Sequence, residues 1–215
     1  MSEPTREMAM LKIWGRTNSL NVQKALLCLE EIGLPYVRID AGLHFGVNDT
    51  PAYRAMNPNG LVPTIDDDGF VLWESNSIVR YLAATHSAGA IWLVDAKQRA
   101  LAERWMDWQL SAFIPAINAA FLQLVRTPPA QRQPDAIEAS RKAGERAVAI
   151  LDAHLEGRDW LAGDQFTIAE CAIAPVAHRW LHLPMAREPR PNIERWYASV
   201  MQRTAAQKVL LLPLT

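Results

Sequence analysis

The sequence changes character near residue 90, and this change constrains the fold more than any other feature. Before it, short apolar segments typical of strands alternate with helical patterns, whereas the later part has helical patterns almost throughout. A segment of small residues at 87–90 separates the two parts. We therefore expect a flexible extension at 1–9, an α/β domain at 10–86, a linker at 87–94 and an all-helical domain at 95–215.

The first part predicts seven elements in the order β-α-β-α-β-β-α. Apolar residues between 22 and 32 repeat at helical spacing, and Gly33 is a typical helix stop. A helix between the first two strands implies parallel pairing, whereas the turn Asp67-Asp68-Gly69 indicates an antiparallel hairpin. The expected strands are 11–14, 35–40, 62–65 and 70–73, and the expected helices are 19–33, 50–56 and 75–85.

The second part predicts four helices, at about 95–125, 133–155, 167–180 and 191–203. Pro115 lies inside the first of them and predicts a kink there, because proline has no N–H and clashes with the preceding turn. Thr167 and Glu170 have the spacing of a capping box. We interpret that box as a folding element without a catalytic role.

The charge balance argues against nucleic acid or a membrane as a partner. The chain has 22 Lys and Arg against 23 Asp and Glu, and its formal net charge is −1. It therefore has no general basic field to attract polyanions. Its uninterrupted apolar stretches are only a few residues long, whereas a membrane span needs about 20.

The cysteines and histidines indicate neither a disulfide scaffold nor a metal site. Cys28 and Cys171 form no CxxC pair, and both lie in apolar helical patterns, where packing is the simpler interpretation. The five histidines show no HxxxH or HExxH spacing, so no metal is expected. The N-terminal residues lack the apolar core of a secretion signal. Together these features favour a reducing, cytoplasmic setting.

Ser19 stands where the first strand leads into the first helix, a position that favours an anion. Free backbone N–H groups and the helix dipole stabilise negative charge there. A hydroxyl group can also donate a hydrogen bond to a bound thiolate, and both effects lower the pKa of a thiol. From the residues alone, Ser19 is either such a thiolate partner or a plain helix cap.

Two later segments have the chemistry of a peptide-binding site. Val62-Pro63 is a candidate cis bond that would turn the main-chain groups of Val62 outward, where an extended peptide can pair with them. Glu74-Ser75 begins the third helix. Glu74 can receive an ammonium group, while Ser75 can hold a carboxylate or simply cap the helix. For both segments an ordinary turn or cap is the alternative.

These segments occur in one order: strand–Ser–helix, then NPNGLVP, then WES before a helix, then a helical domain with FTIAE. The combination resembles the soluble glutathione S-transferase family over almost the whole chain. The segment WGRTNSLNVQKALLCLEEIGLPY looks like its bacterial, serine-type side, with theta-, phi- and nu-like members. The resemblance implies a thioredoxin-like N-terminal domain, a helical-bundle C-terminal domain and a cytosolic homodimer that uses glutathione as co-substrate.

The resemblance also implies roles for single residues. Ser19 matches the serine that hydrogen-bonds the glutathione sulfur, and Asn21 matches an asparagine that some disulfide-reducing members place near it. Asn18 is present as well, so which of the three side chains faces the thiolate stays open. The element that pairs with the cysteinyl unit is Val62-Pro63, and the pair that holds the γ-glutamyl group is Glu74-Ser75. His44 lies in the loop that supplies a basic residue for the glycyl carboxylate. Leu61 departs from relatives that have Gln or Lys before the Val-Pro pair.

We expect a transferase that adds the thiolate of glutathione to a small hydrophobic electrophile. The aromatic residues Trp105, Trp108 and Phe113 are candidates for the wall of the substrate pocket, although an aromatic helix face is more often core. Two alternatives remain at this point. One is a glutathione-dependent disulfide or peroxide reductase with the same site, and the other is a non-catalytic binding module.

Overall fold

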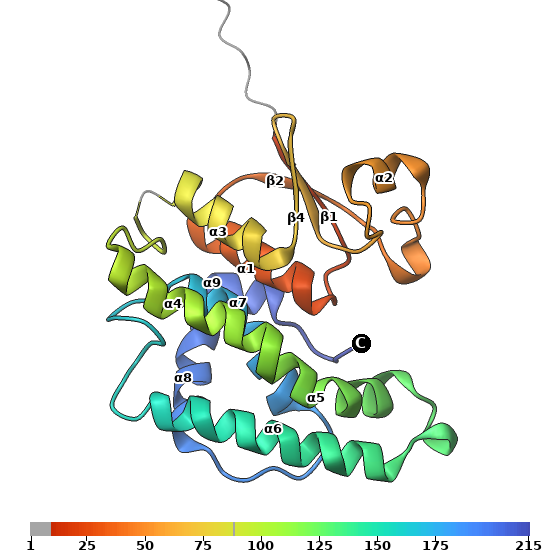
Figure 1. Cartoon of the computed structure of the whole chain (residues 1–215), viewed down its shortest axis with the longest axis vertical. Helices are drawn as coiled ribbons and strands as arrows, with labels where there is room; N and C mark the ends of the chain where they lie inside the picture. The colour runs from red at the N-terminus through yellow and green to blue at the C-terminus, as the bar shows by residue number, and fades with distance from the viewer. Residues whose placement is uncertain (1–9, 88) are drawn as a thin grey trace, which may run out of the picture.

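The computed structural model describes residues 10–87 and 89–215. The extension predicted at 1–9 and Ala88 of the predicted linker lie outside these residues. Figure 1 shows a small sheet with its helices above a larger group of helices. This arrangement confirms the predicted thioredoxin-like domain followed by a helical domain.

The first part has the predicted order of strands and helices. Within the described residues, the sheet has the strand order β2-β1-β3-β4, with β1 parallel to β2 and antiparallel to β3. The hairpin of β3 and β4 is antiparallel. The strands are β1 (Leu11–Trp14), β2 (Tyr36–Ile39), β3 (Thr64–Asp67) and β4 (Phe70–Trp73), and the helices are α1 (Leu20–Ile32), α2 (Pro51–Met56) and α3 (Ser75–His86), with a 3-10 turn at Leu43–Phe45.

Strand β3 is displaced by two residues from its predicted bounds of 62–65. The Val62–Pro63 peptide bond is cis, as predicted, and Pro63 has no N–H to offer a ladder, so the strand begins at Thr64. The hairpin turn then consists of Asp68 and Gly69 alone. Both have positive φ (51° and 91°), as two-residue hairpin turns require.

The helix predicted at 95–125 is a continuous run with two π-helical turns. It comprises α4 (Ala96–Trp108), a π turn (Gln109–Phe113), α5 (Ile114–Phe121) and a second π turn (Leu122–Arg126). The first π turn directly precedes Pro115, where the kink is predicted. The proline ring clashes with the carbonyl group of a regular α-helical turn before it, and the wider π turn relieves this clash.

Among the remaining helices, α7 (Ile168–His182) lies in the core and contacts α1, α3, α4 and α5. The others are α6 (Pro134–His154), α8 (Pro191–Met201) and α9 (Thr204–Val209), with a 3-10 turn at Pro129–Gln131. The helix predicted at 191–203 is α8, which ends at Met201, and the short helix α9 after it was not predicted; the extended backbone of Arg203 separates the two. The predicted capping box is confirmed: Thr167 N–H donates to Glu170 Oε2 at 2.8 Å.

The two parts meet where α1 and α3 face α7 and α4. Figure 1 shows α1 and α3 between the sheet and the helical domain, and residues of α1 contact both α3 and α7. Cys28 and Cys171 are free and fully buried at this junction, which confirms that they pack in the core. The N-terminal end of α1 therefore lies near the boundary between the two domains.

Candidate active site at the junction of the two domains

Ser19 is the N-cap of α1 and leaves its hydroxyl group unused. Its backbone is extended (φ −83°, ψ 122°), and among the described residues its side chain makes no capping hydrogen bond. The side chain is 7% exposed. The helix that follows has 13 residues and ends at Gly33, whose φ is 70°. Ser19 thus presents a free hydroxyl group at the positive end of a helix dipole.

The loop that carries Val62 and Pro63 is held from inside by two buried residues. Asn57 Nδ2 donates to Leu61 O at 2.8 Å and to Thr64 Oγ1 at 3.1 Å. The Tyr53 hydroxyl group donates to Leu61 O at 2.6 Å. Among the described residues, the main-chain N–H and C=O of Val62 make no hydrogen bond. They remain available to an added strand.

Glu74 turns the chain between β4 and α3 in a conformation that is uncommon for a non-glycine residue. It has φ 73° and ψ 110°, and it occupies the N-cap position of α3. The prediction that Ser75 caps this helix is therefore wrong: Ser75 is its first helical residue. Its hydroxyl group instead donates to Asn21 Oδ1 of α1 at 3.4 Å.

These residues form one hollow at the edge of the sheet domain. Asn21, Val62, Pro63, Glu74 and Ser75 line it together with Leu61 and Trp73. The fold thus brings five of the predicted site residues together from α1, the cis-proline loop and the start of α3. Leu61 is 66% exposed and Trp73 is 36% exposed, so the rim of the hollow is partly apolar, and the exposed Asn59 and Glu74 supply its polar part.

A buried lysine lies behind this hollow. The Lys24 side chain is fully buried, and among the described residues its ammonium nitrogen has no hydrogen-bond partner. Burial lowers its pKa to about 7, an effect that the negative charge of Glu74 opposes and the positive charge of Arg179 reinforces. Sequence reasoning did not identify Lys24, because its position matches the apolar face of α1.

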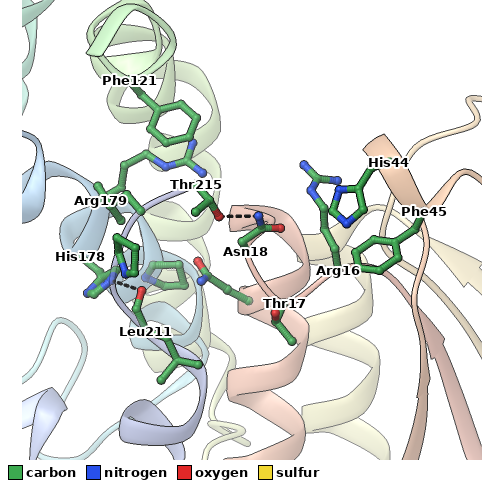
Figure 2. Close-up of a pocket in the computed structure, with 14 residues that line it drawn as sticks. Arg16, Thr17, Asn18, His44, Phe45, Phe121, His178, Arg179, Leu211 and Thr215 are labelled. Carbon is green, nitrogen blue, oxygen red and sulfur yellow. Dashed lines mark hydrogen bonds between the residues drawn. The ribbon is translucent and has the colours of Figure 1, made fainter. Parts of the chain in front are cut away.

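A second cavity, of about 280 Å³, lies between the domains, and Ser19 itself is a lining residue of neither this cavity nor the first hollow. Thr17 and Asn18, which directly precede Ser19, line it from the sheet domain. His44 and Phe45 belong to the same side (Figure 2), and Phe121 and Arg179 face them from α5 and α7. His44 thus lines this cavity with Asn18, and not the hollow that holds Val62, Pro63, Glu74 and Ser75; its ring contacts Phe45 with centroids 4.0 Å apart.

This second cavity is cationic. Arg16 and Arg179 both line it, and no aspartate or glutamate is among its described lining residues. Burial and the positive charges of Arg126 and Arg16 together lower the pKa of Arg179 to about 9. The Arg179 guanidinium carbon lies 3.6 Å from the ring centroid of Phe121, and that of Arg126 lies 4.9 Å from it. Figure 2 shows Arg179 and Phe121 across the cavity from Arg16 and His44.

The structure places the predicted substrate wall elsewhere. Trp105 and Trp108 stack edge to face, and both line a hollow with Ile150 and His154 between α4 and α6. Phe113 is fully buried in the core. None of the three aromatic residues lines the first hollow or the second cavity. The phenylalanines that line the Asn18 cavity are instead Phe45 and Phe121.

Sequence reasoning missed Arg16, Phe121 and Arg179. The signal for Arg16 was its place in the turn just before Ser19, which puts its side chain beside the start of α1. Phe121 and Arg179 come from helices that are distant in the sequence, so no local pattern marks them. Among residues 10–87 and 89–215, no group of three His, Cys, Asp or Glu side chains is placed to hold a metal ion.

Comparison with known families identifies both parts of the chain. The family model described as "Glutathione S-transferase, N-terminal domain" matches residues 18–85, and that described as "Glutathione S-transferase, C-terminal domain" matches residues 134–199.

Two similar proteins match nearly the whole chain. "Glutathione S-transferase GstB" of Escherichia coli (strain K12) is 45% identical over 208 residues, which are 96% of this chain and all of that protein. "Glutathione S-transferase 3" of Zea mays is 32% identical and covers 96% of both chains.

Among solved structures, a theta class glutathione S-transferase from the citrus canker pathogen Xanthomonas axonopodis pv. citri is similar throughout. That structure has glutathione bound. It is 43% identical, has a TM-score of 0.93, and the match covers 97% of this chain and all of that one. The apo form of the enzyme from that pathogen has a TM-score of 0.84 at 36% identity.

Proposed function

Because the chain belongs to the soluble glutathione S-transferase family and is a glutathione transferase, we propose that Ser19 stabilises the thiolate of bound glutathione. The observation that carries this proposal is the unused hydroxyl group of Ser19 at the N-terminal end of α1. A free thiol with a pKa of about 8.5 is only a few per cent ionised at neutral pH. A hydrogen bond and a helix dipole that together lower that pKa by about two units make the thiolate the main species.

Glutathione would lie along the hollow that begins at Asn21. Its cysteinyl unit would pair with the unpaired main-chain groups of Val62, which the cis bond to Pro63 turns outward. Its γ-glutamyl ammonium group would meet Glu74, and its α-carboxylate would meet Ser75 at the start of α3. The glycyl carboxylate would point toward His44. We assign Asn21 the role of positioning Ser75, because its amide oxygen accepts the Ser75 hydroxyl group.

The electrophile would enter the cavity next to Thr17 and Asn18. There the thiolate sulfur attacks an electrophilic carbon, a C–S bond forms, and the leaving group departs with its electron pair. The thiol proton passes to solvent before the attack, so no covalent intermediate with the protein is needed. The protein contributes proximity and a stabilised nucleophile. Phe121 and Leu214 supply apolar surface in this cavity.

The test compares Ser19→Ala with the unchanged chain by ultraviolet difference spectroscopy of the glutathione complex at varied pH. We expect a thiolate band well below the pKa of free glutathione, and its loss in Ser19→Ala. Turnover should fall far more than affinity for glutathione. Ser199→Ala, which removes a hydroxyl group bonded to Arg195 O on α8, is the matched control. An equal thiolate band in Ser19→Ala would contradict the assignment.

We also propose that the protein is a cytoplasmic homodimer. The run Ala96–Arg126 contains an 18-residue window apolar enough for a membrane span, yet only 28% of that window is buried within the chain. This helix packs against α6 and α7 in a folded domain, and Leu101 and Leu110 on it stay exposed. A second copy would cover such a surface. Sedimentation velocity should give twice the mass of one chain, and Leu110→Lys should shift it toward the monomer.

A further inference from the structure

The cavity beside Asn18 has more positive charge than an apolar electrophile requires. Arg16 and Arg179 line it, and Arg126 is close enough to lower the pKa of both. Among the described residues, none of the three arginines forms an ion pair, whereas Arg38, Arg80, Arg141 and Arg203 each face a carboxylate. The three therefore form a cluster of positive charge that has no ion-pair partner among the described residues.

The fold preserves this cluster at some cost. The Nε of Arg16 is buried without a hydrogen-bond partner among the described residues. Its Nη1 lies only 2.8 Å from where a Cβ on Gly42 would be, so the glycine leaves room for the guanidinium group. On the other wall, Arg179 lies against the face of Phe121. An unpaired, partly buried cation is unfavourable unless an anion approaches it.

We propose that this cavity takes an electrophile that carries a carboxylate, and that Arg16 and Arg179 hold the carboxylate while the reacting carbon faces Ser19. Guanidinium groups suit this role, because they bind carboxylates through two parallel hydrogen bonds. The proposal rests on the proposed function, since the thiolate at Ser19 is the nucleophile. The proposal requires the electrophile to carry a negative charge, in addition to the apolar contact that Phe121 and Leu214 supply.

The smallest substrate of this kind is a 2-halocarboxylate such as chloroacetate. The glutathione thiolate attacks the carbon that bears chlorine, the C–S bond forms, and chloride leaves with the C–Cl electron pair. The products are S-(carboxymethyl)glutathione and chloride, and the thiol proton has already passed to solvent. No oxidant, reductant or metal is needed, and the carboxylate stays unchanged between the two arginines.

The test uses chloroacetate and chloroacetamide, which share the leaving group and differ in charge. We expect kcat/KM for chloroacetate to exceed that for chloroacetamide by roughly tenfold or more after subtraction of the uncatalysed reaction. The preference should shrink as ionic strength rises. In Arg179→Gln, kcat/KM for chloroacetate should fall toward kcat/KM for chloroacetamide, while KM for glutathione stays unchanged. Arg146→Gln, at an exposed arginine of α6, is the control and should change nothing.

Arg179 is the residue to change, because Arg16 lines the cavity together with His44, the residue that we place near the glycyl carboxylate of glutathione. An equilibrium measurement on the unchanged chain gives a second, independent readout. S-(carboxymethyl)glutathione should bind more tightly than S-(carbamoylmethyl)glutathione, by calorimetry, at equal pH and salt. Equal affinity for the two conjugates would overturn the proposal. So would an Arg179→Gln effect on KM for glutathione that is the same with both electrophiles.

Failure of this inference differs from failure of the proposed function. If Ser19 does not activate the thiol, neither chloroacetate nor chloroacetamide reacts faster than in free solution. If only the charge requirement is wrong, both are turned over and the acid has no advantage. Activity of Arg179→Gln with chloroacetamide shows in the same assay that the variant is folded.

Discussion

Ser75 on α3 donates a hydrogen bond to the side-chain oxygen of Asn21 on α1, at 3.4 Å. The bond joins the first turns of two helices that are 54 residues apart in the chain. Both N-terminal ends therefore point at the same hollow, one next to Ser19 and the other next to Glu74. Two helix dipoles that converge in this way favour a ligand with more than one negatively charged group, and glutathione is such a ligand.

The first prediction concerns this bond. Asn21→Ala should raise KM for glutathione by roughly fivefold with little change in kcat, because a neutral hydrogen bond contributes about 1 kcal/mol. Ser75→Ala removes the same bond, so the effects of the two substitutions should be less than additive in a double-mutant cycle of glutathione affinity. A fall in kcat at unchanged KM would instead place Asn21 beside the sulfur, as in the reductase hypothesis.

The second prediction concerns Lys24, whose pKa falls from 10.5 to about 7 because it is buried. Between these values the unfolded chain binds a proton that the folded chain does not. The free energy of unfolding therefore rises with pH from about 7 toward 10.5. Lys24→Met should stabilise the protein at pH 7 by up to about 5 kcal/mol and flatten the rise between pH 7 and 9.

Urea unfolding at a series of pH values measures the effect of Lys24→Met. The matched control is Lys97→Met, which changes an exposed lysine on α4 and should leave both the stability and its pH dependence unchanged. A Lys24→Met protein that is less stable than the parent at pH 7 would show that attraction to Glu74 outweighs burial.

Local chemistry explains how much of the fold and of the first hollow could be predicted. Gly33 stops α1 because it reaches positive φ, and Thr167 with Glu170 begins α7 through reciprocal hydrogen bonds. The cis bond before Pro63 follows from the properties of proline. Each of these features depends on residues a few positions apart, so the sequence alone carries the signal.

The wall of the second cavity could not be predicted in this way. Trp105 and Trp108 share a helix face, and helical spacing indicates only that shared face, not what it meets. In the structure that face meets His154 of α6, not the start of α1. Phe121 and Arg179 meet Arg16 only through packing between α5, α7 and the sheet domain. The charge of the cavity is thus a property of the tertiary structure.

The third prediction concerns the packing of α6 on α7. A Cβ on Gly144 would lie 2.1 Å from Cζ3 of Trp180, which is too close for any real contact. Gly144→Ala should therefore destabilise the protein by about 2 kcal/mol or more, although alanine is the better helix former by about 1 kcal/mol. Thermal or urea unfolding of the variant measures this loss.

A cycle with Trp180→Phe separates the clash from other effects of the substitution at Gly144. Phenylalanine lacks the ring atoms that the new methyl group would meet, so Gly144→Ala should cost much less in that background, or even stabilise the protein. The same loss of stability in both backgrounds would mean that Trp180 is not the obstacle.

The last prediction concerns His178, which joins α7 to α8 and to the chain after α9. Its Nδ1 lies 2.6 Å from the Tyr197 hydroxyl group, and its Nε2 lies 3.2 Å from Leu211 O. A carbonyl group only accepts, so Nε2 carries the proton and Nδ1 accepts from Tyr197. Burial and the charges of His182 and Arg179 together lower the pKa of His178 from 6.5 to about 4, while the hydrogen bond with Leu211 O opposes this shift.

The pH dependence follows from the direction of that shift. As the pH falls from 6.5 to 4, the unfolded chain takes up a proton that the folded chain resists, so the free energy of unfolding falls. The contribution of His178 is at most about 3 kcal/mol. His178→Gln should lower stability at pH 7, where it loses the paired ring, yet lose less stability on acidification than the parent does. Parallel stability curves for the two proteins from pH 7 to pH 4 would show that His178 does not control the acid sensitivity.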